Sequence, residues 1–387
     1  EPELGRRPAG EDAPLSFGQQ RLWMIDQIEG DNRALHLSLA MRLRGPLNLP
    51  ALRKALEAVV ARHEVLRTRF VMKVRDLEPV QQVLPSLSIE LPVEDLGGVA
   101  SGQRGTGIEV MQELMGMPFD LAAPPLIRAR LVRFGPEEHS LMLVLHHAVT
   151  DRWSLLILAG EIMQLYGAFD AGLPSPLPEL PVQYGDYALW ERRRLQGPRM
   201  SALLAYWRKK LVALEPLELP LDHPRPAVQK FAGASEAIMV PSAMLDSVDR
   251  IARGSGATRF MALLAVFIAV LQRYGGQTDV VVGTPVTNRN DPALERLVGF
   301  FLNTLVLRVD VAGDPTFAEL LERVRSTTLE AFAHQELPFE RVVQELNPPR
   351  DPSRSPLFQV LFVQTDQALS GHEKRSAATT SVKVRDL

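Results

Sequence analysis

The sequence predicts an α/β fold in which layers of helices pack against β-sheets (α+β layers). Segments with apolar side chains at helical spacing alternate with strand-like segments along the 387 residues. Hydrophobic residues make up 46% of the chain and charged residues 23%, which is the balance of a soluble globular protein with a large core. At roughly 100–200 residues per domain, this length predicts two or three folding units.

The first half of the chain predicts four helices and five strands. A helix is expected at 15–30, with Ser16 as its N-cap, and another at 48–66, with Pro50 in its first turn. The other helices are expected at 107–119 and 153–169. Strands are expected at 37–45, 67–74, 79–85, 125–134 and 139–147. The last strand is apolar almost throughout, which predicts burial on both of its faces.

The second half begins after residues 170–186, where four prolines and little periodicity indicate a boundary. Helices are expected at 187–197, 201–214, 242–256, 257–276, 316–335 and 338–346, and strands at 236–241, 279–288, 304–311 and 357–364. The apolar run 260–271 is too short to span a bilayer, so we expect a buried core helix there.

Composition excludes several classes of function. The net charge is −3, and no basic excess or basic amphipathic stretch indicates nucleic acid or a membrane as a partner. The chain has no cysteine, which excludes disulfides, thiolate nucleophiles and Cys-ligated zinc and is consistent with a cytoplasmic protein.

The stretch "LVLHHAVTDRWSLL" (143–156) is the strongest candidate for chemistry. Adjacent side chains of a strand point to opposite faces, so His146 and His147 should diverge, with one structural and the other functional. A neutral imidazole in a dry site is a competent general base near pH 7. A metal site is not expected, because the two histidines diverge and no third ligand lies at a useful spacing.

The residues after Asp151 open the predicted helix at 153–169. Backbone N–H groups at such a helix start could stabilise an oxyanion, and here they belong to Arg152, Trp153 and Ser154. The local pattern alone leaves two interpretations open, a catalytic histidine and a buried histidine of the core.

Seven segments together resemble the motifs of nonribosomal peptide synthetase condensation domains. The HHxxxDG signature is matched at 146–152 except in its last position, and six further segments follow the family order: "LSFGQQRLW" (15–23), "RHEVLRTRF" (62–70), "YGDYALW" (184–190), "LVGFFLNTL" (297–305), "HQELPFE" (334–340) and "RDPSRSPLFQVLF" (350–362). We refer to these seven segments as the first to seventh motifs, with HHxxxD as the third.

This resemblance implies two chloramphenicol-acetyltransferase-like lobes, arranged as a V-shaped pseudo-dimer with a tunnel between them. We expect residues 1–13 to be a linker from an upstream domain, 14–175 the N-terminal lobe and 176–387 the C-terminal lobe. The first two motifs resemble the subgroup that joins an L-donor to an L-acceptor.

The resemblance also implies partners and a reaction. An upstream carrier protein presents a donor acyl or peptidyl thioester and a downstream carrier protein presents an acceptor aminoacyl group, each on a phosphopantetheine arm. The acceptor amine attacks the donor thioester and an amide forms. The domain itself is expected to bind no cofactor and to adjoin an adenylation domain.

Carried over to this chain, the second histidine, His147, is the catalytic candidate, acting either as a base or by positioning the amine. His146 is a support residue. Asp151 is expected to be structural and to pair with an arginine of the second motif, with Arg67 as first choice and Arg62 as second.

The fifth motif and the start of the predicted helix supply further candidates. Gly299, Asn303 and Ser154 are candidates for a lobe-interface or tunnel position, with strand-end structure as the alternative for Gly299 and Asn303. The aromatic residues Trp23, Tyr184 and Trp190 are expected in the core or an interface.

One position departs from the family pattern, because Arg152 stands where the family has glycine. Glycine at a turn usually allows positive φ or a close backbone approach. We expect Arg152 either to enter the tunnel as a gate on the acceptor side or to point into solvent. A cation near His147 would also disfavour the protonated imidazole.

Three other functions are compatible with parts of the pattern. An epimerisation domain shares HHxxxD but usually continues with Ser-Trp, whereas this chain has Trp153-Ser154. A non-catalytic recruiting relative loses the second histidine, which is kept here as His147. A free-standing acyltransferase would use a soluble acyl donor. Heterocyclising relatives are excluded, because they have aspartate in place of the histidines.

Overall fold

The structure, a computed structural model, describes residues 2–8, 10–30, 33–73, 78–97, 107–229, 233–349, 351–364 and 383–386. Several predictions therefore extend beyond the described residues. These are the strand expected at 67–74 by one residue, the linker by residues 1 and 9, and the seventh motif by its first residue. The N-terminal lobe includes the undescribed residues 31–32, 74–77 and 98–106, and the C-terminal lobe includes 230–232, 350, 365–382 and 387.

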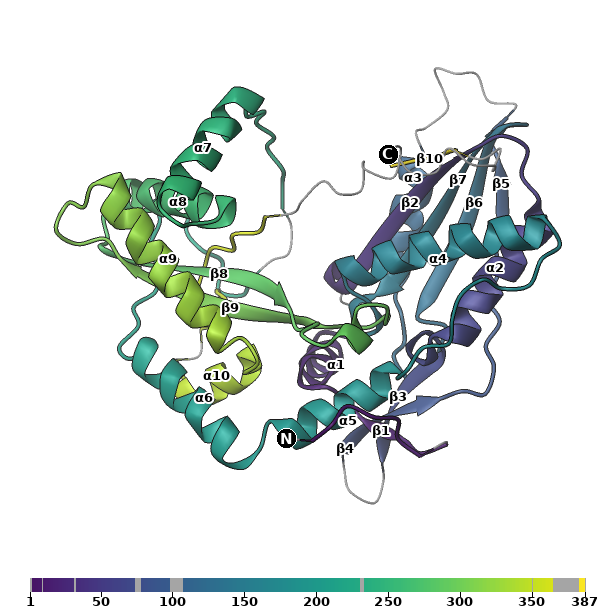
Figure 1. Cartoon of the computed structure of the whole chain (residues 1–387), viewed down its shortest axis with the longest axis horizontal. Helices are drawn as coiled ribbons and strands as arrows, with labels where there is room; N and C mark the ends of the chain where they lie inside the picture. Colours follow the sequence, from purple (N-terminus) through teal and green to yellow (C-terminus); the bar gives the residue numbers. More distant parts are fainter. Residues whose placement is uncertain are drawn as a thin grey trace. The chain divides into compact units, whose positions relative to one another are not determined.

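The chain divides into two compact units, which Figure 1 shows. Unit 1 comprises Glu1–Arg194, Arg289–Phe301 and Asp366–Leu387, and unit 2 comprises Leu195–Asn288 and Leu302–Thr365. Each unit combines helices with β-sheet, as the sequence predicted.

Unit 1 is built around a five-stranded sheet in which a buried strand occupies the middle. The order is β10 (Lys383–Asp386), β2 (His36–Arg44), β7 (Glu138–His146), β6 (Ile127–Gly135) and β5 (Val93–Asp95). The pairs are antiparallel except β5 with β6. Strand β7 is buried along all but its first residue, which confirms the prediction from its apolar run.

A second, three-stranded sheet of unit 1 has the order β1 (Ala13–Pro14), β4 (Glu78–Val83) and β3 (Thr68–Lys73). The helices of this unit are α1 (Phe17–Glu29), α2 (Leu49–Arg62), α3 (Ile108–Gly116), α4 (Arg152–Asp170) and α5 (Tyr184–Arg194). Helix α4 crosses the five-stranded sheet and packs on α2 (Figure 1).

Local sequence explains where these helices start. Ser16 caps α1 by accepting a hydrogen bond from the N–H of Gln19, whose side chain accepts one from the N–H of Ser16. Asn48 caps α2, and Pro50 lies in its first turn, where a missing N–H costs nothing.

The short 3₁₀ helices of unit 1 are η1 (Arg33–Leu35), η2 (Glu64–Arg67), η3 (His147–Val149) and η4 (Pro292–Leu294).

Unit 2 packs helices against a two-stranded antiparallel sheet of β8 (Asp279–Thr287) and β9 (Leu302–Asp310). Its helices are α6 (Gly197–Lys210), α7 (Ser242–Gly254), α8 (Arg259–Gly275), α9 (Phe317–Ala333) and α10 (Phe339–Leu346). Helices α8 and α9 pack on each other, and α9 packs on β9.

The apolar helix α8 contributes one face to the core of unit 2, as predicted, and its opposite face is partly exposed. Met261, Leu264 and Ile268 are in the core, whereas Val266 and Val270 on the other face are 46% and 43% exposed.

Two predicted strands of unit 2 do not form as such. Residues 236–241 are irregular, and Ile238 and Met239 are at least 90% exposed, because no partner strand lies beside them in the described part of the chain. Residues 357–364 make only a parallel bridge from Leu361 to Gly283 of β8. An added Cβ on Gly283 would lie 2.5 Å from the ring of Phe358, so the seventh motif packs closely on β8.

The division between the units lies further along the chain than the predicted boundary at residue 175. The proline-rich segment belongs to unit 1, because Arg6 donates to the carbonyls of Leu180 and Pro181, and Arg62 donates to that of Pro178. The segment has no regular secondary structure at 173–180, in agreement with its lack of periodicity, and arginine side chains bind three of its carbonyls.

The described residues of the predicted linker 1–13 also pack on unit 1. Arg7, nine-tenths buried, forms ion pairs with Glu64 of the second motif and Asp186 of the fourth. The carbonyl of Pro2 accepts a hydrogen bond from the indole of Trp190. These contacts make the segment part of the domain.

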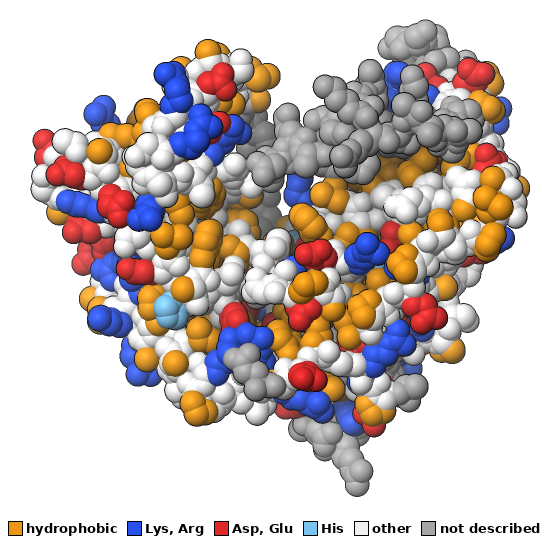
Figure 2. All heavy atoms as spheres, in the orientation of Figure 1, with side chains coloured by type: hydrophobic (Ala, Val, Ile, Leu, Met, Phe, Trp, Pro, Cys, Tyr) orange, Lys and Arg blue, Asp and Glu red, His pale blue; other side chains and the backbone are white. Residues whose placement is uncertain are grey.

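The distribution of charged side chains on the surface agrees with the near-neutral net charge of the chain. On the face shown in Figure 2, basic and acidic side chains are interspersed.

In the part of the chain that the structure describes, no single helix is long and apolar enough to cross a membrane. Helices α7 and α8 reach the necessary length and composition only when taken together, and the pair is bent by 104°.

Candidate active site

The candidate site lies in unit 1, where β7 ends and α4 begins. Strand β7 stops at His146, the 3₁₀ turn η3 starts at His147, and Asp151 is the N-cap of α4. His146 is 1% exposed while His147 is partly exposed, so the two histidines diverge as predicted.

His146 holds the turn from inside. Its Nδ1 accepts a hydrogen bond of 3.0 Å from the N–H of Ala148, so the proton of the neutral ring is on Nε2. That Nε2 finds no partner among the described residues. The rings of His36 and Phe119 meet the imidazole ring of His146 edge-on. Burial lowers the pKa of His146 to about 3, which suits a support residue that stays neutral.

His147 is oriented by its own turn. Its Nδ1 lies 2.8 Å from the carbonyl oxygen of Thr150. A carbonyl only accepts, so Nδ1 carries the proton of the neutral ring and Nε2 carries a lone pair. The ring of Phe300 meets the imidazole edge-on, with centroids 4.8 Å apart.

Burial lowers the pKa of His147 below its ordinary value of 6.5, outweighing the opposing effect of the Thr150 carbonyl. The imidazole is therefore neutral near pH 7. Arg21 of α1 is a cation that contributes to this lowering. The expectation that Arg152 contributes as well stays a prediction.

Asp151 pairs with Arg289, and the predicted pairing with Arg67 or Arg62 was wrong. The guanidinium Nη2 of Arg289 lies 3.3 Å from Oδ1 of Asp151. The carboxylate, 0% exposed, also accepts from the N–H of Ser154 at 2.7 Å and of Phe301 at 3.1 Å. It thus joins the start of α4 to the fifth motif.

Sequence reasoning missed Arg289, which organises the segment Arg289–Phe301. Its Nη1 donates to the carbonyls of Leu294 and Leu297, and its guanidinium lies 3.9 Å above the ring of Phe301. A buried aspartate favours a cation as its partner, and Arg289 is one of two arginines between the predicted strand at 279–288 and the fifth motif, so this stretch was a signal that could have been used.

The two arginines of the second motif that were expected to pair with Asp151 have other partners. Arg62 donates to Glu161 of α4 at 3.0 Å, and the Nε2 of His63 lies 2.7 Å from the other oxygen of Glu161. Burial lowers the pKa of His63 despite this carboxylate. Arg67 donates to the carbonyl of Leu84. The second motif is therefore linked to the middle of α4 rather than to its start.

The hydroxyl of Ser154 forms three hydrogen bonds, two with Gly299 of the fifth motif and one with Arg289. Its hydroxyl donates to the carbonyl of Gly299, accepts from the N–H of the same glycine, and accepts from Arg289 at 2.8 Å. Because its own N–H is bonded to Asp151, the expectation that this N–H stabilises an oxyanion was wrong.

Gly299 is required by the close approach of Tyr184. An added Cβ would lie 1.9 Å from Cδ2 of the tyrosine, closer than any van der Waals contact. Tyr184 is buried and its hydroxyl donates to the carbonyl of Phe300 at 2.6 Å. The prediction that Tyr184 belongs to the core is confirmed; Trp23 and Trp190 are only partly exposed.

Asn303 lies in unit 2 and its four hydrogen bonds are structural. Its Nδ2 donates to the carbonyls of Gln335 and Leu337, and its Oδ1 accepts from the N–H groups of Thr304 and Phe339. The residue thus joins β9 to the sixth motif. These contacts favour the strand-end role; a tunnel position stays a prediction.

The first motif also reaches the turn η3 that carries His147, which sequence reasoning did not anticipate. Gln19 donates to the carbonyl of Ala148 at 3.0 Å and to the side chain of Gln81. Gln19 is completely buried, so the middle of η3 is held from both sides, by Gln19 at one carbonyl and by His146 at one N–H.

Arg152 is the first residue of α4 and is exposed. Its backbone is helical, so the position does not need a glycine for positive φ. Its guanidinium makes no hydrogen bond or ion pair within the described ranges. The neighbouring Trp153 is 47% exposed and donates to the carbonyl of Glu295.

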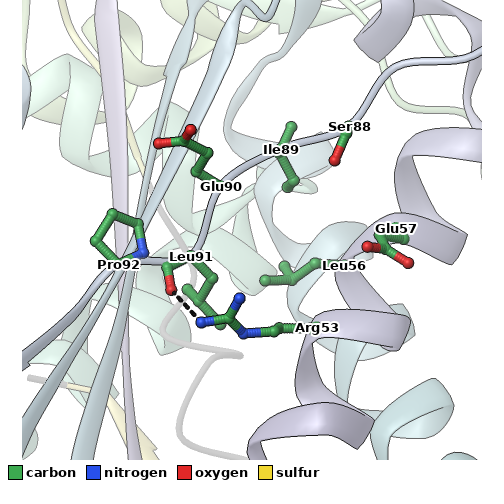
Figure 3. A pocket seen from close by; sticks show the side chains of 8 residues that line it. All are labelled: Arg53, Leu56, Glu57, Ser88, Ile89, Glu90, Leu91 and Pro92. Carbon is green, nitrogen blue, oxygen red and sulfur yellow. Dashed lines mark hydrogen bonds between the residues drawn. The ribbon is translucent and has the colours of Figure 1, made fainter.

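Other surroundings do not add to this site. The groove in Figure 3 lies between α2 and residues 88–92, and no residue of the candidate site lines it. Its lining consists of Arg53, Leu56, Glu57, Ser88, Ile89, Glu90, Leu91 and Pro92. Among the described residues, no group of three or more His, Asp or Glu side chains could hold a metal ion.

Comparison with known proteins identifies the family. The family model of the condensation domain matches residues 10–386. The chain belongs to the condensation-domain family. Its relatives include malpibaldin synthetase of Mortierella alpina, 45% identical over 93% of the chain, and chondramide synthase of Chondromyces crocatus, 40% identical over 91%.

This condensation domain spans only 6% and 9% of the lengths of those two relatives. The X-domain from teicoplanin biosynthesis is a structural neighbour with a TM-score of 0.86 and 29% identity, covering 99% of this chain and 84% of that one. The condensation domain from the monacolin K polyketide synthase MokA matches with a TM-score of 0.78 and 26% identity, covering 91% and 81%. The fold is chloramphenicol-acetyltransferase-like, and the chain is a condensation domain of the nonribosomal peptide synthetase type.

Proposed function

We propose that this condensation domain forms an amide between a donor acyl or peptidyl thioester on an upstream carrier protein and an acceptor aminoacyl group on a downstream one. The amine nitrogen attacks the thioester carbon, the C–N bond forms, and the C–S bond breaks. The proton lost by the amine goes to the departing thiolate of the phosphopantetheine arm. The first two motifs favour an L-donor and an L-acceptor.

The protonation state of His147 carries this proposal. Its Nδ1–H is engaged by Thr150, so the Nε2 lone pair is the group that can accept a proton from the attacking amine and pass it to sulfur. The lowered pKa keeps that lone pair available near pH 7. A positioned base of this kind contributes roughly 10²–10⁴ in rate.

Partners follow from the same proposal. The reaction needs two carrier proteins and their phosphopantetheine arms, an adenylation domain that supplies the acceptor, and no cofactor held by the condensation domain. An epimerisation domain would instead invert a carrier-bound residue without joining two, so the configuration of the product distinguishes that alternative.

A non-catalytic recruiting role is the second candidate, and the high TM-score to the teicoplanin X-domain favours it. A solved complex pairs that X-domain with OxyB. The departure at Arg152 is also in its favour. The retained His147, with its ordered tautomer, favours catalysis, because a recruiting surface has no need of a neutral imidazole with a lone pair.

The test loads an upstream carrier with a donor peptide and a downstream carrier with an aminoacyl group, and follows amide formation by mass spectrometry. Wild type should form the amide, and His147→Ala should reduce the rate about 100-fold or more. His223→Ala, which changes an exposed histidine in a loop of unit 2, is the matched control and should match wild type. Equal inactivity of wild type and His147→Ala favours the recruiting role.

We also propose that Arg152 narrows the space available to the acceptor. Its exposed guanidinium is at the start of α4, five residues after His147, and is not used in any contact among the described residues. Arg152→Gly should therefore extend amide formation to larger acceptors. An unchanged acceptor range in that variant rejects the gate and leaves the solvent-facing alternative.

A further inference from the structure

The position of the His147 ring depends on Phe300. The phenyl ring meets the imidazole edge-on with centroids 4.8 Å apart, and Thr150 fixes only the Nδ1 edge of the ring. A shift of Phe300 would therefore rotate or expose the imidazole. The residues that hold the backbone at 299–301 consequently determine where the Nε2 lone pair points.

That backbone is held from two sides. On one side, Ser154 and Asp151 bind the amide groups of Gly299 and Phe301. On the other side, the Tyr184 hydroxyl donates to the carbonyl of Phe300 at 2.6 Å. Phe300 thus has its carbonyl fixed by a residue of the fourth motif.

Tyr184 itself has little freedom. Its ring lies against Gly299 so closely that no Cβ fits between them, and it meets Phe301 edge-on at 5.0 Å. The hydroxyl accepts a hydrogen bond from Ser16, which is 2.9 Å away. Burial raises the pKa of Tyr184 well above its usual range, so the hydroxyl keeps the proton that it donates to Phe300.

We propose that Tyr184 is a positioning residue for the amide-forming reaction, holding the carbonyl of Phe300 so that the phenyl ring fixes the imidazole of His147. This inference rests on the proposed function. Tyr184 touches neither substrate nor His147, and it acts through Phe300. The fourth motif thereby has a role in catalysis that its buried location does not suggest.

Tyr187 provides a matched control on the same helix. It is also buried, and its ring lies 4.7 Å from that of Phe301. Its hydroxyl, however, donates to Glu191 of α5 and not to the 299–301 backbone. Tyr184→Phe and Tyr187→Phe each remove one buried hydroxyl and keep the ring, so they differ in the bond to Phe300.

The experiment measures two quantities in the full chain with loaded carriers. Steady-state kinetics give kcat and KM, and NMR of ¹⁵N-histidine-labelled protein gives the tautomer and pKa of His147. Tyr184→Phe should lower kcat about 10-fold with KM within about twofold, since small misplacements of a reacting group are costly. The pKa of His147 should rise toward 6.5 as water reaches the ring. Tyr187→Phe should leave both unchanged.

Two results overturn the inference: unchanged His147 signals in Tyr184→Phe, or equal effects of the two variants on kcat and on those signals. If the wild type forms no amide, the NMR arm alone decides, and a His147 shift confined to Tyr184→Phe keeps the inference although the proposed function fails. Circular dichroism confirms folding. Ser16→Ala removes the hydrogen bond that the Tyr184 hydroxyl accepts from Ser16. This variant should raise the pKa of His147 by less than Tyr184→Phe does.

Discussion

The guanidinium of Arg289 lies against the carboxylate of Asp151, and the two side chains are 4% and 0% exposed. Removing one member of a buried ion pair leaves an uncompensated charge and typically costs about 3–5 kcal/mol. Asp151 also caps α4 and binds the N–H of Phe301, so the pair supports both the helix start and the segment that faces His147.

Arg289→Gln should lower the free energy of unfolding by about 3 kcal/mol, because the buried carboxylate of Asp151 loses its ion-pair partner. Arg67→Gln should cost less than about 1 kcal/mol, because this arginine has no contact with Asp151. Urea unfolding monitored by circular dichroism compares the two. A larger loss in Arg67→Gln than in Arg289→Gln contradicts the pairing.

The sequence predicted the residues around His147 better than it predicted their partners. The divergence of His146 and His147 follows from strand periodicity, and the Ser16 cap follows from local chemistry, so both were accessible. The pairing of Asp151 with Arg289 joins positions 138 residues apart. Residue types alone cannot choose among several arginines at such separations.

The errors in unit 2 have a related cause. Apolar composition indicates that residues 236–241 prefer burial, but whether they are covered depends on what packs against them. Ile238 is 90% exposed, and residues 236–241 have no partner strand in the described part of the chain. Strand formation likewise requires a partner, and residues 357–364 obtain only the bridge to Gly283.

Amide formation should depend on the neutral form of His147. Because burial depresses its pKa below 6.5, more than half of the rate at pH 8 should remain at pH 6.5, and the rate should fall to half only at a lower pH. A pH profile of kcat, with carrier loading held constant, measures this. A rate that has already fallen to half its pH 8 value at pH 6.5 would show that the imidazole titrates at its ordinary pKa and is not buried during catalysis.

Stability should fall at acidic pH because of His146. Its pKa is about 3 in the folded state and about 6.5 in the unfolded state, so between these values only the unfolded chain binds the proton. The contribution is complete above pH 6.5 and should be lost at about 1.4 kcal/mol per pH unit below it. His146→Asn keeps an acceptor for the Ala148 N–H and should show a shallower pH dependence. Urea unfolding at pH 7, 6 and 5 compares the slopes, and equal slopes contradict the assignment.

The contact between Gly299 and Tyr184 should make Gly299→Ala strongly destabilising. The added Cβ would lie 1.9 Å from a tyrosine ring that is buried and bonded at its hydroxyl, so neither side can yield. Overpacking of this kind costs about 1–3 kcal/mol and occasionally more. Tyr184→Ala removes the ring, and in that background Gly299→Ala should cost less than about 1 kcal/mol. Such coupling is expected only for residues in contact.

Gly160→Ala is the control for this cycle, because it changes another glycine of unit 1, in the interior of α4, whose Cβ would meet nothing within 4 Å. Alanine is the better helix former, so this variant should be stabilised by about 0.5–1 kcal/mol. The four variants are compared by urea unfolding. If Gly299→Ala instead lowers the free energy of unfolding equally with and without the Tyr184 ring, the glycine is needed for its backbone conformation, and the close approach of Tyr184 does not explain it.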